Sequence, residues 1–275
     1  NPAIVNKGTV LTGTVKGLYE GTGEQDEPFV AIPYYAWAHR GQGQMAVWLP
    51  AVSSLAVAVP APTPSELISH WTLDETSGTS AADSSGKGMT GSLKNGQSFT
   101  TNSVAGHIGS ALAFDGTNDY IDVIDGYSDF TKGCTVSVWV YPTAVKTWAR
   151  FIDFGNASSS DNIWFGRQNA TSNLAFEGWA GSSSSGLVTA ADAIVLNTWQ
   201  MFTATVDTGG NVKLYKNGEL VATGTSGVSS ITRTRNYIGR SNWSGDQYYQ
   251  GNMDDVRIYN YCLTAAQVQA LYTGQ

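Results

Sequence analysis

The stretch QMFTATVDTGGNVKLYKNGELVATGT, residues 200–225, contains three expected strands and the two turns that join them. The strands are expected at Gln200–Asp207, Asn211–Lys216 and Glu219–Thr225, which are rich in β-branched and aromatic residues. Asn217-Gly218 separates the last two strands, and this pair is preferred in a type I′ hairpin turn because both positions need a positive φ. The stretch therefore predicts an antiparallel sheet.

The same pattern of short strands and turns extends over the rest of residues 67–275. Gly, Asn, Asp and Ser separate the apolar runs, as in a β-sandwich or jelly roll. A short helix is expected only at the end, where Thr264 caps a segment that runs to Leu271. The other expected strands are Ile68–Leu73, Ala111–Phe114, Tyr120–Val123, Thr135–Tyr141, Arg150–Phe154, Asn162–Arg167, Asn173–Trp179, Asn236–Ile238 and Gly251–Tyr259.

The chain before residue 67 divides into two further parts. Residues 1–50 predict a small β hairpin or meander, with strands at Gly8–Val15, Val30–Ala38 and Gln44–Pro50. Residues 51–66 are rich in Ala and Pro, which is typical of a semi-rigid linker. We therefore expect a β segment at 1–50, a linker at 51–66 and a sandwich at 67–275.

Composition and charge narrow the range of partners. The formal net charge is −7, and without a basic patch this argues against a nucleic-acid partner, because such affinity depends on clustered Lys and Arg. The longest apolar run, Ala51 to Ala61, is too short to span a bilayer, so we expect no membrane segment. We expect a monomeric module. Cys134 and Cys262 either bond to each other or stay as buried thiols.

Eight short motifs follow one another in residues 67–275, and together they resemble the LamG-like members of the concanavalin A-like lectin/glucanase superfamily. The resemblance implies an all-β jelly-roll sandwich of two antiparallel sheets, an extracellular location and one structural calcium ion (Ca2+). The motifs are His70-Trp-Thr-Leu-Asp-Glu75, Ala82-Asp-Ser-Ser-Gly86, Gly109-Ser-Ala-Leu-Ala-Phe-Asp-Gly116, Asp119-Tyr-Ile-Asp-Val123, Thr135-Val-Ser-Val-Trp-Val140, Thr198-Trp199, Leu214-Tyr-Lys-Asn-Gly218 and Asp254-Asp-Val-Arg-Ile-Tyr259.

The first fifty residues carry a second resemblance. Val30-Ala-Ile-Pro-Tyr-Tyr-Ala-Trp-Ala-His-Arg-Gly41 and Met45-Ala-Val-Trp-Leu-Pro50 resemble the C-terminal end of β-L-arabinofuranosidase-like glycoside hydrolases. This resemblance implies that the chain is the tail of a secreted plant-polysaccharide hydrolase with an appended module. It also points to arabinose-containing polymers as the polysaccharide.

The LamG-like resemblance also implies the calcium ligands, which are oxygens of carboxylates and backbone carbonyls. The matching residues are Asp74, Gly116 through its carbonyl, Asp119 and Asp254. The nearest substitutes are Glu75, Asp115 and Asp255. The alternative is that Asp115 and Asp119 only form turns and that Asp255 pairs with Arg257 or another strand residue.

No catalytic constellation is evident in the sequence. Hydrolytic glucanases of this superfamily carry Glu-x-Asp-x-x-Glu on one strand, because retaining hydrolysis needs two carboxyl groups about 5 Å apart. After Glu177, the positions of that Asp and second Glu hold Trp179 and Ser182. We therefore expect no enzyme activity in this chain, with an enzyme domain as the rival hypothesis.

Carbohydrate binding needs an aromatic face for the sugar ring and polar groups for its hydroxyls. Three adjacent expected strands offer both, and so does the polar loop Arg240–Tyr249. The candidate ligand-binding residues are Trp148, Arg150, Asp153, Asn162, Trp164, Arg167, Glu177, Trp179, Trp243 and Tyr248. The alternatives are that the tryptophans belong to the core and that Arg150 and Asp153 form an internal ion pair.

These patterns favour a non-catalytic carbohydrate-binding module that tethers a hydrolase to an oligosaccharide or polysaccharide. A protein-recognition, adhesion or structural module of the same fold remains the alternative. The exposure of the tryptophans distinguishes the two, because a sugar platform needs rings that reach the surface.

Overall fold

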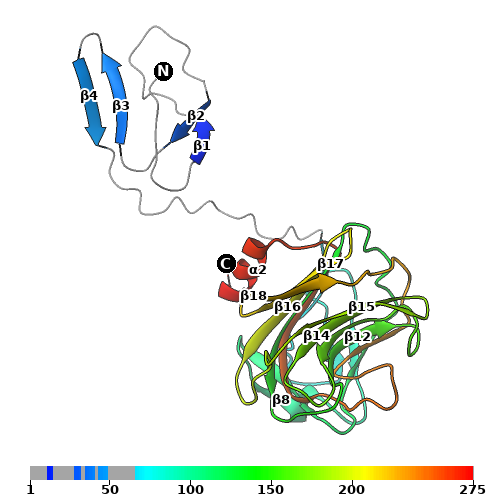
Figure 1. Ribbon diagram of the computed structural model, residues 1–275. Helices are drawn as coiled ribbons and strands as arrows, with labels where there is room; N and C mark the ends of the chain where they lie inside the picture. The colour runs from blue at the N-terminus through cyan, green and yellow to red at the C-terminus, as the bar shows by residue number, and fades with distance from the viewer. Residues whose placement is uncertain (1–10, 15–27, 32–34, 41–42, 49–65, 275) are drawn as a thin grey trace. The chain divides into compact units, whose positions relative to one another are not determined.

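The computed structural model describes residues 11–14, 28–31, 35–40, 43–48 and 66–274 of the chain (Figure 1). It divides into two compact units, Asn1–Ala58 and Val59–Gln275. The division falls within the segment that we expected to be a linker. The role assigned to each part stays a prediction.

The described residues of the first unit form two antiparallel strand pairs. β1 (Leu11–Thr14) pairs with β2 (Pro28–Ala31), and β3 (Tyr35–Arg40) pairs with β4 (Gly43–Trp48). The single strand expected at residues 30–38 is therefore wrong, because the described residues of this range belong to two strands with different partners.

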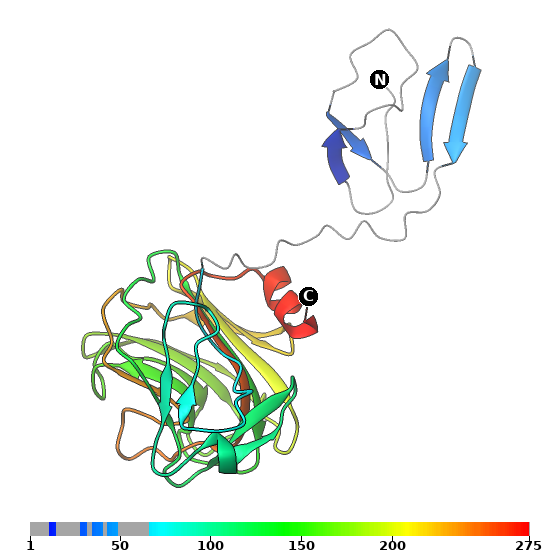
Figure 2. The ribbon, with the colours of Figure 1, turned by 180° about the vertical axis from the view of Figure 1, so that it is seen from behind.

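The second unit consists of two eight-stranded sheets stacked in two layers (Figures 1 and 2). The β12 sheet has the order β15 (Ser183–Ala190), β14 (Leu174–Ala180), β13 (Ile163–Arg167), β12 (Arg150–Gly155), β19 (Arg235–Ile238), β10 (Ile121–Val123), β7 (Gly91–Leu93) and β6 (Ser80–Ala81). The β11 sheet has the order β18 (Glu219–Thr225), β17 (Asn211–Lys216), β16 (Gln200–Val206), β11 (Cys134–Pro142), β20 (Gln250–Tyr259), β9 (Ser110–Asp115) and β8 (Ser103–Ala105), with β5 (Leu67–Trp71) also paired to β20. All pairs between these strands are antiparallel, so the predicted fold class is confirmed.

The core fills the space between the two sheets. Phe151 of β12 stacks on Phe202 of β16 with ring centroids 5.9 Å apart, which joins the sheets directly. Trp71 has no exposed surface, and its indole N–H donates to the carbonyl of Met89 at 2.8 Å. Burying such large apolar side chains contributes about 1.5–3 kcal/mol each, so these aromatic residues account for much of the stability of the sandwich.

The segment of residues 200–225 folds as predicted. Residues 200–225 form β16, β17 and β18, and Asn217 and Gly218 have φ values of 51° and 83°. These values confirm the type I′ turn, which joins β17 to β18 with the right-handed twist that the strands need.

The expected helix is α2 (Ala265–Thr273), which lies beside β18 (Figure 1). The side chain of Thr264 accepts from the N–H of Gln267, whose side chain accepts in return from the N–H of Thr264. This reciprocal pair is a capping box. Val268 is fully buried and Tyr272 stacks on Trp139 at 5.6 Å, so the helix covers the outer side of the β11 sheet.

The short strands β6, β7 and β8, the helical turn α1 (Phe99–Asn102) and the longer strand β15 escaped prediction. Cys134 and Cys262 are free in this structure, and burial raises the pKa of the Cys134 thiol to about 12. Among the described residues, no helix is both long and apolar enough to cross a bilayer.

Candidate functional site

One row of side chains runs across the β12 sheet on the side that faces away from the β11 sheet, which we call the outer face. Strand pairing places Tyr237, Asp153, Trp164 and Glu177 side by side on β19, β12, β13 and β14. Their neighbours along the strands, such as Phe154, point into the core. Because successive side chains of a strand alternate between its two faces, this row lies on the outer face.

Four tryptophans gather around Arg150 on this face, and we call them the tryptophan cluster. Trp148 and Trp164 meet edge to face at 5.9 Å, and Trp179 and Trp243 meet at 5.6 Å with an interplanar angle of 55°. Trp164 is only 2% exposed, whereas the other three rings are partly exposed. The cluster therefore presents aromatic surface to the solvent.

Arg150 connects the two tryptophan pairs. Its Cζ lies 3.6 Å from the ring centroid of Trp164, 5.3 Å from that of Trp148 and 5.6 Å from that of Trp243. Such contacts stabilise a desolvated cation by up to about 2 kcal/mol. Burial lowers the pKa of Arg150, although nearby carboxylates counteract this effect.

The ion pair of Arg150 differs from the one expected. Its Nη2 lies 3.0 Å from Oδ2 of Asp246, whereas no ion pair with Asp153 forms. Nε and Nη1 of Arg150 are buried and have no hydrogen-bond partner among the described residues. With 4% of its surface exposed, Arg150 lies beneath the rings, and its contact with a ligand stays a prediction.

Asp153 fastens the loop Arg240–Tyr249 to the sheet. Its Oδ1 accepts from Nδ2 of Asn162 at 2.8 Å and from Nδ2 of Asn242 at 3.0 Å. Its Oδ2 accepts from the N–H of Asn242 at 2.8 Å and from the hydroxyl of Ser241 at 3.3 Å. Asp153 and Asn162 have no exposed surface, and their contact with a ligand stays a prediction. Burial raises the pKa of Asp153, and Arg150 and these donors only partly offset the rise.

Glu177 orients two of the indole rings. Its Oε2 accepts from Nε1 of Trp164 at 2.8 Å and from Nε1 of Trp179 at 2.9 Å. The hydroxyl of Ser184, on the unpredicted strand β15, donates to Oε1. Because the carboxylate is held from both ends, it fixes the planes of the rings, as a ligand platform requires.

Two predicted residues lie outside the tryptophan cluster. Arg167 is 3% exposed and donates to the carbonyl of Thr171, and its contact with a ligand stays a prediction. Tyr248 is partly exposed but lies beside Tyr120, with ring centroids 6.2 Å apart. Tyr249, the next residue along the chain, is buried.

Three carboxylates surround Arg150, and each is already engaged. Asp153 is buried, Glu177 accepts from two indoles, and Asp246 accepts from Arg150 and, at 2.7 Å, from the hydroxyl of Ser241. Burial raises the pKa of Asp246. Retaining glycoside hydrolysis needs two carboxyl groups that reach the substrate from about 5 Å apart. The outer face offers rings and hydroxyl groups instead, which suits binding.

Family models match two parts of the sequence. Residues 115–269 match the concanavalin A-like lectin/glucanases superfamily. The chain belongs to this superfamily. Residues 5–50 match the glycoside hydrolase family 127 C-terminal domain. Both matches agree with the resemblances that the sequence motifs carried. Comparison with curated protein sequences gives no match.

Solved structures share the lectin-like sandwich. Domain 4 of AbnA, a GH43 extracellular arabinanase from Geobacillus stearothermophilus, solved in complex with arabinotriose, is 23% identical with a TM-score of 0.57, and the match covers 75% of this chain and 98% of that one. The binding domain of Paraclostridial Mosquitocidal Protein 1 is 15% identical with a TM-score of 0.57, covering 77% and 52%. The receptor binding domain of botulinum neurotoxin C/D mosaic serotype is 16% identical with a TM-score of 0.58, covering 78% and 52%. At these identities the likeness concerns the fold.

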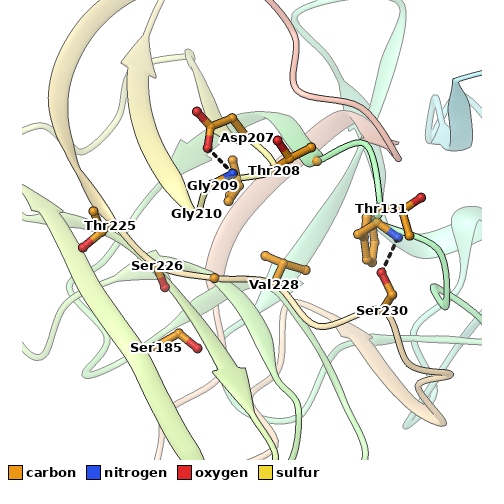
Figure 3. A pocket seen from close by; sticks show the side chains of 14 residues that line it. Thr131, Ser185, Asp207, Thr208, Gly209, Gly210, Thr225, Ser226, Val228 and Ser230 are labelled. Atoms are coloured by element: carbon orange, nitrogen blue, oxygen red, sulfur yellow. Dashed lines mark hydrogen bonds between the residues drawn. The ribbon is translucent and has the colours of Figure 1, made fainter.

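The lectin-like sandwich also contains a hollow of about 490 Å³ near the turn that joins β16 to β17 (Figure 3). Small polar residues such as Thr208 and Ser226 line it, and Phe130, the only aromatic among its 14 lining residues, is 5% exposed. Asp207 uses its carboxylate within its own turn, accepting from the N–H groups of Gly209 and Asn211. The hollow therefore lacks the ring face that the tryptophan cluster provides.

The four predicted calcium ligands separate into two groups. Asp74 and Asp254 meet at the loop of residues 106–110, where they accept from the N–H groups of Ser110 at 2.7 Å and Ile108 at 2.8 Å. Oδ1 of Asp254 is buried without a hydrogen-bond partner among the described residues. Burial raises the pKa of Asp254 to about 7, and the neighbouring Asp255 and Asp74 contribute to the rise. This orphaned oxygen beside a second carboxylate fits a bound cation.

Asp119 and Gly116 belong to the turn between β9 and β10. Asp119 accepts from the N–H of Asp115, and Asp115 pairs in register with Gln250, four positions before Asp254 on β20. No three His, Cys, Asp or Glu side chains gather into a metal-binding group within the described part of the chain. The expectation of one site from all four residues is therefore not supported.

The three substitutes are engaged elsewhere. Glu75 accepts from the N–H of Ala82 at 2.7 Å, and Asp115 accepts from N–H groups of its own turn. Asp255 lies 2.6 Å from His70 and 3.0 Å from Arg257, which is the pairing that the alternative described.

Proposed function

We propose that this chain is a non-catalytic carbohydrate-binding module whose ligand lies on the tryptophan cluster. The observation that carries the proposal is the gathering of the partly exposed rings of Trp148, Trp179 and Trp243 on one sheet face. The apolar face of a sugar ring packs on such indoles, and neighbouring hydroxyl groups bind at the polar edge. The buried Arg150 and the partly exposed Glu177 hold the rings in place before ligand arrives, which reduces the entropy lost on binding.

Two comparisons support a polysaccharide as the ligand and arabinose as one of its sugars. The arabinanase domain with the same fold was solved with arabinotriose, and residues 5–50 match a glycoside hydrolase C-terminal domain. In this proposal the chain is part of a secreted hydrolase that acts on arabinose-containing plant polymers. Holding the polymer close raises the effective substrate concentration for the linked enzyme without any new catalytic group.

Isothermal titration calorimetry of the 275-residue chain with arabinotriose and a panel of plant oligosaccharides tests the proposal. We expect Trp179→Ala and Trp243→Ala each to weaken binding at least tenfold, which corresponds to about 1.4 kcal/mol. Trp199→Ala is the matched control, because Trp199 is also partly exposed but packs near Trp139 and Tyr141 on the β11 sheet.

The control should bind as tightly as the wild type. Equal loss in all three variants, or binding that survives both substitutions in the cluster, would place the ligand elsewhere. No binding to any glycan by the folded chain would leave the protein-recognition alternative.

We also propose a structural calcium ion between Asp74 and Asp254. Calcium would neutralise two carboxylates that lie close together at the loop of residues 106–110. Chelation should lower the melting temperature of the wild type, and calcium, rather than zinc, should restore it. Asp254→Asn should abolish this response, whereas Asp119→Asn, on the other turn, should keep it. A melting temperature that ignores chelation would remove the proposed ion.

A further inference from the structure

A second aromatic group lies on the outer face, and we call Tyr120, Tyr237 and Arg240 the tyrosine patch. Cζ of Arg240 lies 4.6 Å from the ring centroid of Tyr120 and 4.5 Å from that of Tyr237. The two tyrosine rings meet edge to face at 5.4 Å, and Tyr248 borders the patch. All four side chains are partly exposed. The patch therefore presents ring faces and a cation together.

The patch lies on the same sheet as the tryptophan cluster. Tyr237 pairs in register with Asp153, which pairs with Trp164, so two strand spacings separate Tyr237 from Trp164. This separation is about 10 Å, close to the length of two sugar residues. The loop Arg240–Tyr249 joins them, because it carries Arg240 at one end and Trp243 on the other side of its contact with Asp153.

The guanidinium of Arg240 has no hydrogen bond or ion pair with any described residue. Three other arginines of the sandwich differ. Arg233 is fully buried and donates to backbone carbonyls, including that of Tyr127 at 2.7 Å, while Arg150 and Arg257 have carboxylate partners. Arg240 is thus positioned by ring contacts alone, with its donors open to the surface.

The charges around the patch favour an anion. Asp122, on the same outer row of β10, is paired with Lys94 at 3.2 Å. Burial raises the pKa of the Tyr237 hydroxyl, and the positive charges of Arg240 and the exposed Arg235 partly offset this rise. Although the whole chain carries a net charge of −7, the surroundings of the patch combine two arginines that have no ion pair among the described residues with one aspartate that is paired to a lysine. Local attraction over a few ångströms outweighs the distant charges, which salt screens beyond about 8–10 Å.

We propose that the tyrosine patch is a second subsite that binds a sugar residue carrying a carboxylate, that is, a uronic acid. The guanidinium fork matches a carboxylate in a bidentate arrangement, and the tyrosine rings receive the apolar face of the sugar. This inference rests on the proposed carbohydrate-binding function and specifies its ligand. The polymer would then be acidic, with a uronic acid at the tyrosine patch.

The experiment compares each acidic ligand with its own carboxyl-reduced form. Calorimetry of the full chain uses trigalacturonate and a glucuronic-acid-substituted xylo-oligosaccharide, each beside the neutral sugar made by reducing its carboxyl groups. We expect the wild type to prefer at least one acidic form by about tenfold, or about 1.4 kcal/mol. High salt should reduce this preference.

Variants separate the two subsites. Arg240→Gln should abolish the preference for the acidic form, Arg240→Lys should keep part of it, and Trp179→Ala should weaken both forms alike. Lys213→Gln is the control, because it removes the same charge from an exposed position on β17 of the other sheet. Melting temperatures near that of the wild type confirm that the variants are folded.

The possible outcomes distinguish the uronic acid subsite from the proposed carbohydrate-binding function. Equal affinity of the wild type for the acidic and reduced forms overturns the uronic acid subsite but leaves tryptophan-dependent binding in place. A preference that persists in Arg240→Gln also overturns it. Absence of binding to any glycan overturns the proposed function and this inference together.

Discussion

Glu177 offers the sharpest test of how the tryptophan cluster is built. Its Oε2 accepts from the indoles of Trp164 and Trp179, and Ser184 donates to Oε1. In Glu177→Gln the amide oxygen can keep both indoles, while the amide nitrogen donates to the Ser184 hydroxyl after that hydroxyl rotates. In Glu177→Ala both indoles lose their acceptor. Both variants remove the negative charge that acts on Arg150, so their difference isolates the hydrogen bonds.

The magnitude follows from the burial of each ring. Trp164 is 2% exposed, so its orphaned N–H should cost about 1–3 kcal/mol of unfolding free energy. Trp179 is partly exposed and its N–H can turn to water, so it adds little. We expect Glu177→Ala to destabilise the sandwich by about 2–3 kcal/mol and Glu177→Gln by less than about 1 kcal/mol.

Urea unfolding followed by circular dichroism measures stability, and calorimetry with the preferred oligosaccharide measures binding. Glu177→Gln should bind nearly as well as the wild type, whereas Glu177→Ala should lose affinity because the plane of Trp179 is no longer fixed. If Glu177→Gln were as unstable as Glu177→Ala, the charge beside Arg150, and not the indole hydrogen bonds, would be the main contribution of Glu177.

Three further predictions concern stability. Asp153→Asn should destabilise the sandwich by about 3–5 kcal/mol in urea, because a buried acceptor is replaced by a donor that faces other donors. Burial raises the pKa of Asp83, but hydrogen bonds from N–H groups and a hydroxyl outweigh it and lower the pKa. Because the pKa of Asp83 is lowered in the folded state, its ionised carboxylate stabilises the fold above the unfolded pKa of about 3.9. This stabilisation is lost as the pH falls through the folded-state pKa. The difference in melting temperature between Asp83→Asn and the wild type should therefore shrink from pH 7 to about pH 3. Thr264→Ala should cost about 1 kcal/mol in urea by removing the cap of α2, whereas Thr264→Ser should cost less.

The parts of the fold that follow local rules could be predicted. The Asn217-Gly218 turn and the capping box at Thr264 need only neighbouring residues. Strand β15 escaped because Ser183–Ala190 is largely small and polar, and its pairing with β14, such as Ala190 with Leu174, supplies what its own sequence lacks. Tertiary contacts decide such segments.

The candidate site could be predicted only in outline. A shift in register between Arg150 and Ile152 lets both Phe151 and Ile152 reach the core, so simple alternation misjudges which side chains face outward. Asp153 is buried by Asn242, which is 89 positions away in the sequence, and no local pattern reveals that contact. The sequence therefore indicates which residue types belong to the site, but not how deeply each side chain is buried.

The buried charges explain how one loop can serve two patches of rings. Because Asp153 has no exposed surface, moving Asn242 away would leave a desolvated carboxylate without its donors. Moving Asp246 away would leave the buried guanidinium of Arg150 without its ion-pair partner. The loop is therefore held close to one position, and with it Trp243 on one side and Arg240 on the other. Buried side chains thus determine the geometry that the exposed rings present, and a rigid surface of this kind would lose less entropy on binding the proposed glycan.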